Sequence, residues 1–333
     1  MPASFSCMTE NTERSDPRAP DARPGPAAVC GVMVTYAPDP AGLADALRGA
    51  VASLDALVVV DNSADPIGRQ RVAEAVRSAG PARAGAAIGL ISGQGNVGLA
   101  RALNLGLARA QQDGFGLFLL LDHDSVVDRA ACEALLAARG ELAPSGPTVA
   151  LAAQNVDAAP TGLQARLEEI LYGYSTGARR APRRCALAMT SGMFLSAAAL
   201  RAAGPFDESL FLDAVDHEFC LRSFRRGVPL FVVPRAQIRH ALGRPQPAHW
   251  GPFRVTLREA DPQRLYFSTR DTLRVAIRYL AVRPCVGGTM IAFVASRSVV
   301  YALFARQERG WFHAILNGWV DFLRAAPTPR RAV

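Results

Sequence analysis

Gly116-Leu-Phe-Leu-Leu-Leu-Asp-His-Asp-Ser125 is the stretch that decides the fold of this 333-residue chain. A short apolar run of this kind predicts a strand that is buried on both faces, as in a parallel sheet covered by helices. The run ends abruptly in Asp122 and Asp124, which places two carboxylates at the carboxyl end of the strand. Open parallel sheets bind ligands outside the carboxyl ends of their strands. The stretch therefore predicts both a sheet and a binding edge.

Three further strands precede this one, and a helix follows each of them. The predicted strands are 29–36, 56–63 and 87–91, and the predicted helices are 43–54, 69–78 and 99–111. This β-α-β-α-β-α-β alternation builds an open parallel sheet with right-handed crossovers, so the fold class is α/β and Rossmann-like. The polar residues that follow these strands should gather on one rim. They are Tyr36, Asp61, Asn62, Gly95, Asn96, Asp122 and Asp124.

The second half of the chain alternates less regularly. The pattern predicts strands at 148–156 and 187–195, helices at 197–203 and 214–226, two short strands at 230–233 and 238–240, and mostly helix from 262 to 324. Residues 162–184 form a basic polar stretch to which we assign no element.

The formal net charge of +8 is unevenly distributed. All 37 basic residues are Arg; residues 1–160 hold 12 of them against 17 acids, and residues 161–333 hold 25 against 12. Half of the residues are hydrophobic and 20% are charged, which excludes a wholly disordered chain. The predicted strands lack interleaved aromatic and basic residues, so we expect no nucleic-acid partner.

The six cysteines show neither a C-x-x-C pair nor zinc-ligand spacing, which argues against structural zinc and against a disulfide framework. Residues 1–28 are rich in Pro, contain mixed charges and lack the apolar core of a secretory signal. We therefore expect a disordered leader on a cytoplasmic protein.

Two candidate motifs of the first half each have a structural alternative. Asp122 and Asp124 could hold Mg²⁺ or Mn²⁺ together with diphosphate oxygens and water, or they could cap a strand-to-loop turn. The loop Gly93-Gln-Gly-Asn-Val-Gly98 is similar to a phosphate loop, but it lacks the Walker Lys and the dinucleotide fingerprint. A kinase or dehydrogenase is therefore excluded, and the loop could simply turn the chain tightly into a helix.

An acidic patch, 206–222, interrupts the basic half of the chain. Asp216 at a helix start is suited to act as the general base for an acceptor hydroxyl. The alternative is a solvated acidic face held by pairing of Glu218 with Arg222. His240 follows a short strand, and a lone His is more often structural than a ligand.

In combination these motifs resemble the inverting glycosyltransferase family 2, which has the GT-A fold, and within it the bacterial rhamnosyltransferase branch. The likeness runs from about residue 29 to 245, and a weaker one continues through Arg264-Leu-Tyr266 and Arg270-Asp271. The matching motifs are Val34-Thr-Tyr36, Val60-Asp-Asn-Ser63, Gly95-Asn-Val-Gly-Leu-Ala100 with Asn104 and Gly106, Leu121-Asp-His-Asp-Ser125, Ser191-Gly192, Phe206-Asp-Glu208, Val215-Asp-His-Glu-Phe-Cys-Leu-Arg222 and His240-Ala-Leu-Gly243.

The resemblance implies a role for each matching residue. Nucleotide binding would involve Thr35, Tyr36, Asp61, Asn96, Arg101 and Asp122; the metal, Mg²⁺ or Mn²⁺, would be bound by Asp122, Asp124 and His240; the catalytic base would be Asp216; and the acceptor side would include Ser191, Gly192 and Glu218. Ala37 and Asp271 depart from the family pattern, in which Asn is common at both positions.

The activity implied by the resemblance is an inverting transfer of L-rhamnose from dTDP-L-rhamnose to a cell-surface polysaccharide or a lipid-linked glycan. The near alternative is the same fold with a UDP- or GDP-hexose donor. The alternative of another class is a sugar-nucleotide-binding scaffold without turnover.

We divide the chain into the leader at 1–28, a glycosyltransferase domain at 29–245 and a mostly helical extension at 246–333. The domain splits into a nucleotide-binding half, 29–156, and an acceptor half, 157–245. In the extension, 284–305 has a single charge, Arg297, and is long enough for a membrane span. The surrounding Arg and aromatic residues favour helices lying on the cytoplasmic face of the inner membrane, and the alternative is a helical subdomain packed on the domain.

Overall fold

The computed structural model describes residues 24–142, 150–155, 171–172, 181–240, 245–250, 253–258, 261–304 and 309–324. Most of the predicted leader and of the basic stretch 162–184 lies outside these residues.

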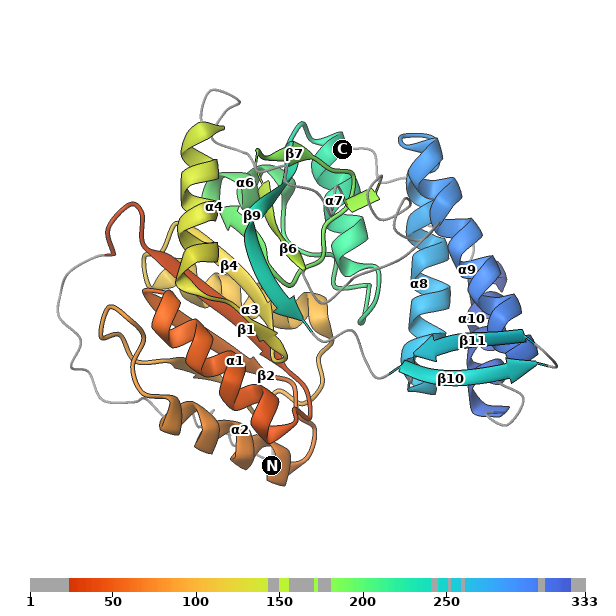
Figure 1. Ribbon diagram of the computed structural model, residues 1–333, viewed down its shortest axis with the longest axis horizontal. Coiled ribbons are helices and arrows are strands. Elements are labelled where there is room, and N and C mark those ends of the chain that lie inside the picture. Colours follow the sequence, from red (N-terminus) through yellow and green to blue (C-terminus); the bar gives the residue numbers. More distant parts are fainter. Residues whose placement is uncertain are drawn as a thin grey trace, which may run out of the picture.

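A nine-stranded sheet forms the centre of the described chain (Figure 1). The strand order is β3 (Gly89–Ile91), β2 (Ala56–Asp61), β1 (Val29–Thr35), β4 (Leu117–Asp122), β8 (Met193–Ser196), β6 (Ala150–Asn155), β9 (Leu230–His240) and β5 (Ser125–Val126), with β7 (Arg183–Arg184) paired to β9. β1 is parallel to β2 and to β4, and β2 is parallel to β3, as predicted. Beyond β4 the sheet is mixed, because β8 runs antiparallel to both β4 and β6, whereas β6 runs parallel to β9.

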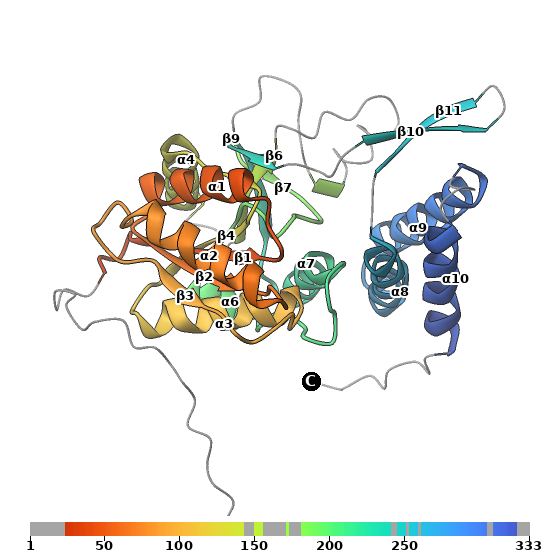
Figure 2. The ribbon, with the colours of Figure 1, turned by 90° about the horizontal axis from the view of Figure 1, so that it is seen from below.

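Helices cover both faces of this sheet (Figure 2). One face packs on α1 (Pro40–Ser53), α2 (Pro66–Ala79) and α4 (Arg129–Glu141), and the other on α3 (Leu99–Gln112), α6 (Ala197–Ala203) and α7 (Val215–Arg225). Val32 and Val34 of β1 lie in the core with α3, whereas Met33 between them lies in the core with α1. Successive strand residues point to opposite faces. A strand covered on both sides therefore needs a continuous apolar run.

Local sequence explains where three helices begin. Asp39, Asp65 and Asp128 cap α1, α2 and α4 by accepting backbone N–H bonds at 2.9, 2.6 and 2.8 Å. A proline in the first turn of α1 and of α2 suits the helix start, where its missing N–H has no intrahelical partner.

Two strand predictions in the second half are wrong in their boundaries. The two short strands expected at 230–233 and 238–240 form one strand, β9, which passes Pro234 through an irregularity in its register with β6. The strand expected at 187–195 begins only at Met193, because Gly192 (φ 84°) sits in a turn closed by the Met193 N–H and the Thr190 carbonyl.

The mostly helical end that was predicted for 262–324 consists of three helices in the described chain: α8 (Pro262–Tyr279), α9 (Pro284–Phe304) and α10 (Arg309–Arg324). A hairpin that the sequence analysis missed, β10 (Pro245–Trp250) with β11 (Phe253–Arg258), precedes them. α8 is the helix of this extension that lies nearest to the sheet domain (Figures 1 and 2). Val275 and Tyr279 of α8 belong to the core around α3, whereas Leu265, Trp311 and Ile315 form a separate cluster.

Candidate functional site

The carboxyl ends of β1, β2, β3 and β4 lie along one edge of the sheet, because these strands are parallel. β2 and β4 flank β1 on opposite sides, so the strand order reverses here. Open α/β sheets bind their ligands at such a point. The edge contains the polar residues that the sequence analysis placed there.

Asp61 is held by three donors at the end of β2. Its Oδ1 accepts from Thr35 Oγ1 at 3.0 Å and from the Ser63 N–H at 2.9 Å, and its Oδ2 accepts from Ser92 Oγ at 3.0 Å. Thr35 and Asp61 are both buried, whereas the neighbouring Tyr36 is 50% exposed. Thr35 and Asp61 thus hold the ends of β1 and β2 together, and Tyr36 is the side chain that is exposed beside them.

Ala37 follows β1 with φ 41°, in the left-handed region that residues with a Cβ rarely adopt. Its N–H donates to Ser63 Oγ at 3.3 Å, and it lines a cavity of about 110 Å³ with Pro38, Asp65, Gly68 and Arg71. Asn tolerates this backbone conformation better than Ala does. The geometry therefore gives a physical reason for an Asn at this position in relatives.

The loop from Gly93 to Gly98 turns the chain tightly into α3. Asn62 Nδ2 donates to the Gly98 carbonyl at 3.2 Å, and the Gly98 N–H donates to Asn96 Oδ1 at 3.1 Å. These bonds build the tight turn that was the structural alternative for this loop. Asn62 Oδ1 is buried and has no hydrogen-bond partner in the described part of the chain. Arg101 is exposed on the first turn of α3.

Asp122 ends β4, and Asp124 lies in the turn to β5; both are half-buried. Ser125 pairs with His240 in the register of β5 and β9, but the side chain of His240 lies outside the described residues. Among the described side chains, no group of three or more His, Cys, Asp and Glu is placed to hold a metal ion. Two carboxylates that supply part of a shell of hard oxygen ligands fit Mg²⁺ or Mn²⁺, which readily share their coordination with phosphate and water.

Ser191 and Gly192 contact β5 and β4, the strands on either side of this turn. Ser191 Oγ is 2.5 Å from Ser125 Oγ, and the Gly192 N–H donates to the Leu120 carbonyl at 2.8 Å. Both residues are buried. Their burial argues against the direct acceptor contact that the resemblance implied, and they instead support the segment that contains Asp124.

Asp216 occupies the first turn of α7, where the sequence analysis placed it. Its side chain is 22% exposed, and its Oδ1 accepts from the His217 N–H at 2.8 Å. His217 Nε2 lies 2.9 Å from Tyr172 Oη and 3.9 Å from Asp216 Oδ1. The preceding Ala214 has φ 64°. Backbone strain of this kind clusters at functional sites, and neither Ala37 nor Ala214 has a sequence signal that reveals it.

Glu218 is buried between α7 and α8. It is 2% exposed, and its two oxygens accept from Arg222 at 2.9–3.1 Å, which confirms the predicted pairing but in a buried rather than a solvated setting. Tyr279 of α8 donates to the same carboxylate at 2.8 Å. The acceptor role implied for Glu218 is therefore corrected, because its carboxylate anchors α7 to α8.

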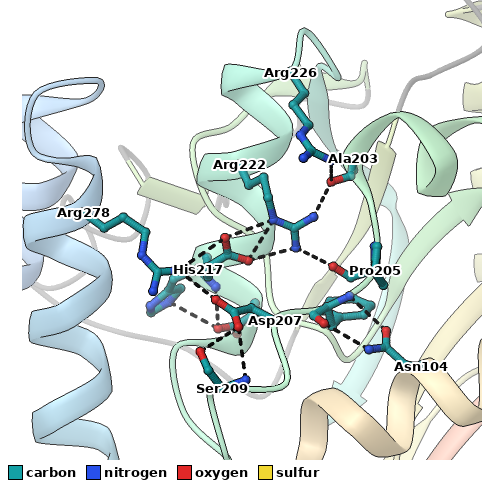
Figure 3. Close-up of polar contacts among 12 residues, drawn as sticks. Asn104, Ala203, Pro205, Asp207, Ser209, His217, Arg222, Arg226 and Arg278 are labelled. Carbon is teal, nitrogen blue, oxygen red and sulfur yellow. Dashed lines mark hydrogen bonds and ion pairs between the residues drawn. The ribbon is translucent and has the colours of Figure 1, made fainter. Parts of the chain in front are cut away.

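Several arginines of the extension are also engaged within the molecule. Arg278 donates to Asp207 at 2.8 Å (Figure 3), Arg270 pairs with Asp271 at 2.7 Å, and Arg297 donates to Ser268 and Thr269 at 2.7 and 3.2 Å. Burial opposes ionisation of Asp207, but hydrogen bonds from Ser209 and Arg278 outweigh it and lower the pKa of Asp207. Part of the positive charge of residues 161–333 is thus engaged in contacts within the protein.

Asn104 of α3 joins regions far apart in the sequence. It donates to the Phe206 carbonyl at 3.0 Å and to Glu208 at 2.9 Å, and it accepts from the Phe206 N–H at 2.9 Å (Figure 3). The sequence analysis quoted Asn104 within a motif but assigned it no role, since its partners lie about a hundred residues away.

The layered α/β sheet with acidic residues at the end of β4 defines the GT-A class of glycosyltransferase fold. A family model described as glycosyl transferase family 2 matches residues 32–202, which is more than half of the chain. The chain belongs to this family.

Solved structures and a curated relative give further comparisons. The mannosyltransferase PcManGT from Pyrobaculum calidifontis, in complex with GDP-Man and Mn²⁺, superposes with a TM-score of 0.54 at 15% identity over 94% of this chain and 91% of that chain. TarS from S. aureus, in complex with UDP-GlcNAc, has a TM-score of 0.53 at 15% identity over 90% and 82%. At this identity both show the fold alone. The dTDP-rhamnosyl transferase RfbF of Shigella flexneri is 34% identical over 62 residues, 19% of this chain and only 21% of the length of that relative.

Proposed function

We propose that this protein is a metal-dependent inverting glycosyltransferase that transfers L-rhamnose from dTDP-L-rhamnose to a cell-surface polysaccharide or a lipid-linked glycan. The observation that carries the proposal is the set of acidic side chains in the fold: Asp122 and Asp124 at the end of β4 and Asp216 at the start of α7. The short match to RfbF supports the rhamnosyl donor. The GDP-Man and UDP-GlcNAc bound in the similar structures favour a hexose donor as the second candidate.

Each group has a role in this reaction. Asp122 and Asp124 would hold the cation with His240, and a bound divalent cation would neutralise charge on the leaving diphosphate. Tyr36, Asn96 and Arg101 contact the nucleotide beside the pair Thr35 and Asp61. Asp216 takes the proton of the acceptor hydroxyl as its oxygen bonds to the anomeric carbon, and the bond to the diphosphate breaks on the opposite face, which inverts that carbon.

The test uses a panel of dTDP-, UDP- and GDP-sugars with purified protein and Mg²⁺ or Mn²⁺. Asp124→Ala should lose metal-dependent nucleotide binding and transfer. Asp216→Asn should lose transfer but still bind the nucleotide, because the proposed role of Asp216 is to accept a proton from the acceptor and not to contact the nucleotide. Asp113→Asn, at the exposed end of α3, is the matched control and should stay active. Full activity of both site variants would overturn the roles, and nucleotide binding without turnover on any acceptor would favour the scaffold.

We also propose that the helical extension lies on an anionic membrane surface. One described helical segment, Pro284–Leu303, is long and apolar enough to cross a membrane, and 28% of its most apolar stretch is buried. Its single charge, Arg297, is turned toward Ser268 and Thr269 of α8. α9 and α10 form the layer farther from the sheet domain (Figure 2). Their exposed apolar side chains include Phe293, Val299, Phe312, Leu316 and Leu323.

Vesicle binding tests this attachment. The protein should sediment with phosphatidylglycerol-containing vesicles more than with phosphatidylcholine vesicles. Burial of the exposed apolar side chains favours binding to both, whereas electrostatic attraction to anionic lipid adds to it only in the first. The double variant Phe293→Ser, Val299→Ser should lose most of this binding. Ile67→Ser, which removes a side chain that is 64% exposed on α2, should not. Self-association through the same face without vesicle binding would overturn the proposal.

A further inference from the structure

The segment Phe206–Ala214, here called the linking segment, lies between α3 and α8 and leads directly into Asp216. On the α3 side, the Leu99 N–H donates to the Phe211 carbonyl at 2.7 Å. Gly98 approaches the same carbonyl so closely that a Cβ at residue 98 would lie 2.7 Å from its oxygen. Phe211 therefore contacts the junction between α3 and the loop from Gly93 to Gly98, here called the glycine loop.

On the α8 side, the linking segment is held by four different contacts, one of which is the 3.6 Å ion pair between Arg264 and Asp213. Asp271 forms a hydrogen bond with the backbone of Phe211, and the ring of Phe267 stacks on the ring of Phe211 with centroids 4.8 Å apart. Arg278 reaches from α8 to Asp207 (Figure 3). The linking segment is thus clamped between the glycine loop and the helical extension.

Asp271 is the buried anchor of this clamp. It is 0% exposed, and Arg270 donates to its two oxygens at 2.7 and 3.0 Å. The guanidinium of Arg270 also lies over the Phe267 ring, 4.9 Å from its centroid. A buried carboxylate that loses its partner is strongly destabilising, so Arg270 and Asp271 act as one unit. Arg270 is thus engaged within the protein by Asp271 and by the hydroxyl of Tyr266.

We infer that Arg270 and Asp271 are a positioning pair for the transfer reaction, an inference that rests on the proposed function. By fixing Phe211, the pair sets the position of Gly98 beside the nucleotide edge and of the helix start that presents Asp216. Neither residue touches the substrate. The helical extension then contributes to catalysis, because its residues Arg270 and Asp271 position Gly98 and Asp216. This role is independent of any contact with a membrane.

The experiment compares Asp271→Leu and Asp271→Asn with a control on α10. Asp271→Leu removes the charge and the hydrogen-bond acceptor, whereas the Asn side chain can still accept from Phe211. The control is Asp321→Asn, which weakens the 2.7 Å bond that Asp321 accepts from Tyr266 of α8 and leaves the linking segment untouched.

Amide hydrogen exchange is the first readout, because it needs no activity. In Asp271→Leu, the amides of residues 98–102 and 207–216 should exchange about tenfold faster, the size of effect typical of contacts that act through packing. Asp271→Asn should fall between this variant and the wild type, and Asp321→Asn should match the wild type. Unchanged exchange in Asp271→Leu would overturn the clamp.

Steady-state kinetics are the second readout. Asp271→Leu should raise the donor KM and lower kcat, each about tenfold, because both Gly98 and Asp216 lose their positions. Faster exchange without a change in KM or kcat would overturn the positioning role. If Asp271→Leu does not fold, Phe211→Ala takes its place in both measurements. If the wild type binds no nucleotide sugar, the proposed function fails, while exchange still decides whether the clamp exists.

Discussion

Tyr279 of α8 donates a 2.8 Å hydrogen bond to Glu218 of α7, at a place where both side chains are buried. Arg222 binds the same carboxylate and also reaches the carbonyls of Ala203 and Pro205 (Figure 3). One buried polar network therefore joins the sheet domain to the helical extension. Burial and the neighbouring Glu218 raise the pKa of Tyr279, which keeps its hydroxyl a donor at neutral pH.

Replacing Glu218 with Ala should lower the free energy of unfolding by about 3 kcal/mol, because Arg222 would remain buried without its counter-ion. Tyr279→Phe should cost about 1 kcal/mol, since it removes one hydrogen bond and keeps the ring. Urea unfolding measures both. The double variant should be less destabilised than the sum of the two, and strict additivity would contradict the network.

Gly98→Ala should destabilise the protein more than Gly80→Ala. Both glycines have positive φ, 84° and 76°, so each substitution incurs about 1 kcal/mol of backbone strain. A Cβ at residue 80 meets open space, whereas one at residue 98 meets the Phe211 carbonyl. Thermal unfolding of the two variants separates strain from steric overlap, and equal losses would show that the contact with Phe211 is unimportant.

Asp207→Asn should reduce stability at pH 7 by about 1 kcal/mol, with an effect that fades in acid. The pKa of Asp207 is lowered from 3.8, so the unfolded chain takes up this proton first as the pH falls. Its contribution is complete above the unfolded pKa and is lost as the pH falls through the folded value. Melting temperatures measured from pH 7 to pH 2.5 test this. A difference from wild type that stays constant over the range would contradict the ion pair with Arg278.

Cys285 should be the one fast-reacting thiol in a Cys7→Ser background. It is exposed on α9, whereas Cys30, Cys132 and Cys220 are buried, and burial above all raises the pKa of Cys30, Cys132 and Cys185 to about 12. Thiolates are the reactive form, so these groups stay inert in the native state. Ellman's reagent at pH 8 should label one thiol rapidly, and Cys285→Ser should abolish this phase. Rapid labelling of a second thiol would contradict the packing around the sheet.

Most of the first half of the fold follows from short stretches of sequence. The sequence analysis missed α4, which begins after Asp128, but the apolar runs that become β1, β2 and β4 end in polar residues. These signals extend over only a few residues, so they can be read locally. The alternation then predicted parallel strands and the edge that contains Asp122 and Asp124.

The roles of the charged residues in the second half depend on long-range contacts that short stretches of sequence do not reveal. The tertiary structure buried Glu218 against Arg222 and Tyr279, turned Arg297 inward, and coupled Asp271 to Phe211. Each of these groups, apart from the local pair of Glu218 with Arg222, depends on a partner distant in the sequence. A charge that is stable when buried looks the same in the sequence as one that is solvated. The difference lies in whether the fold brings a matching partner to it.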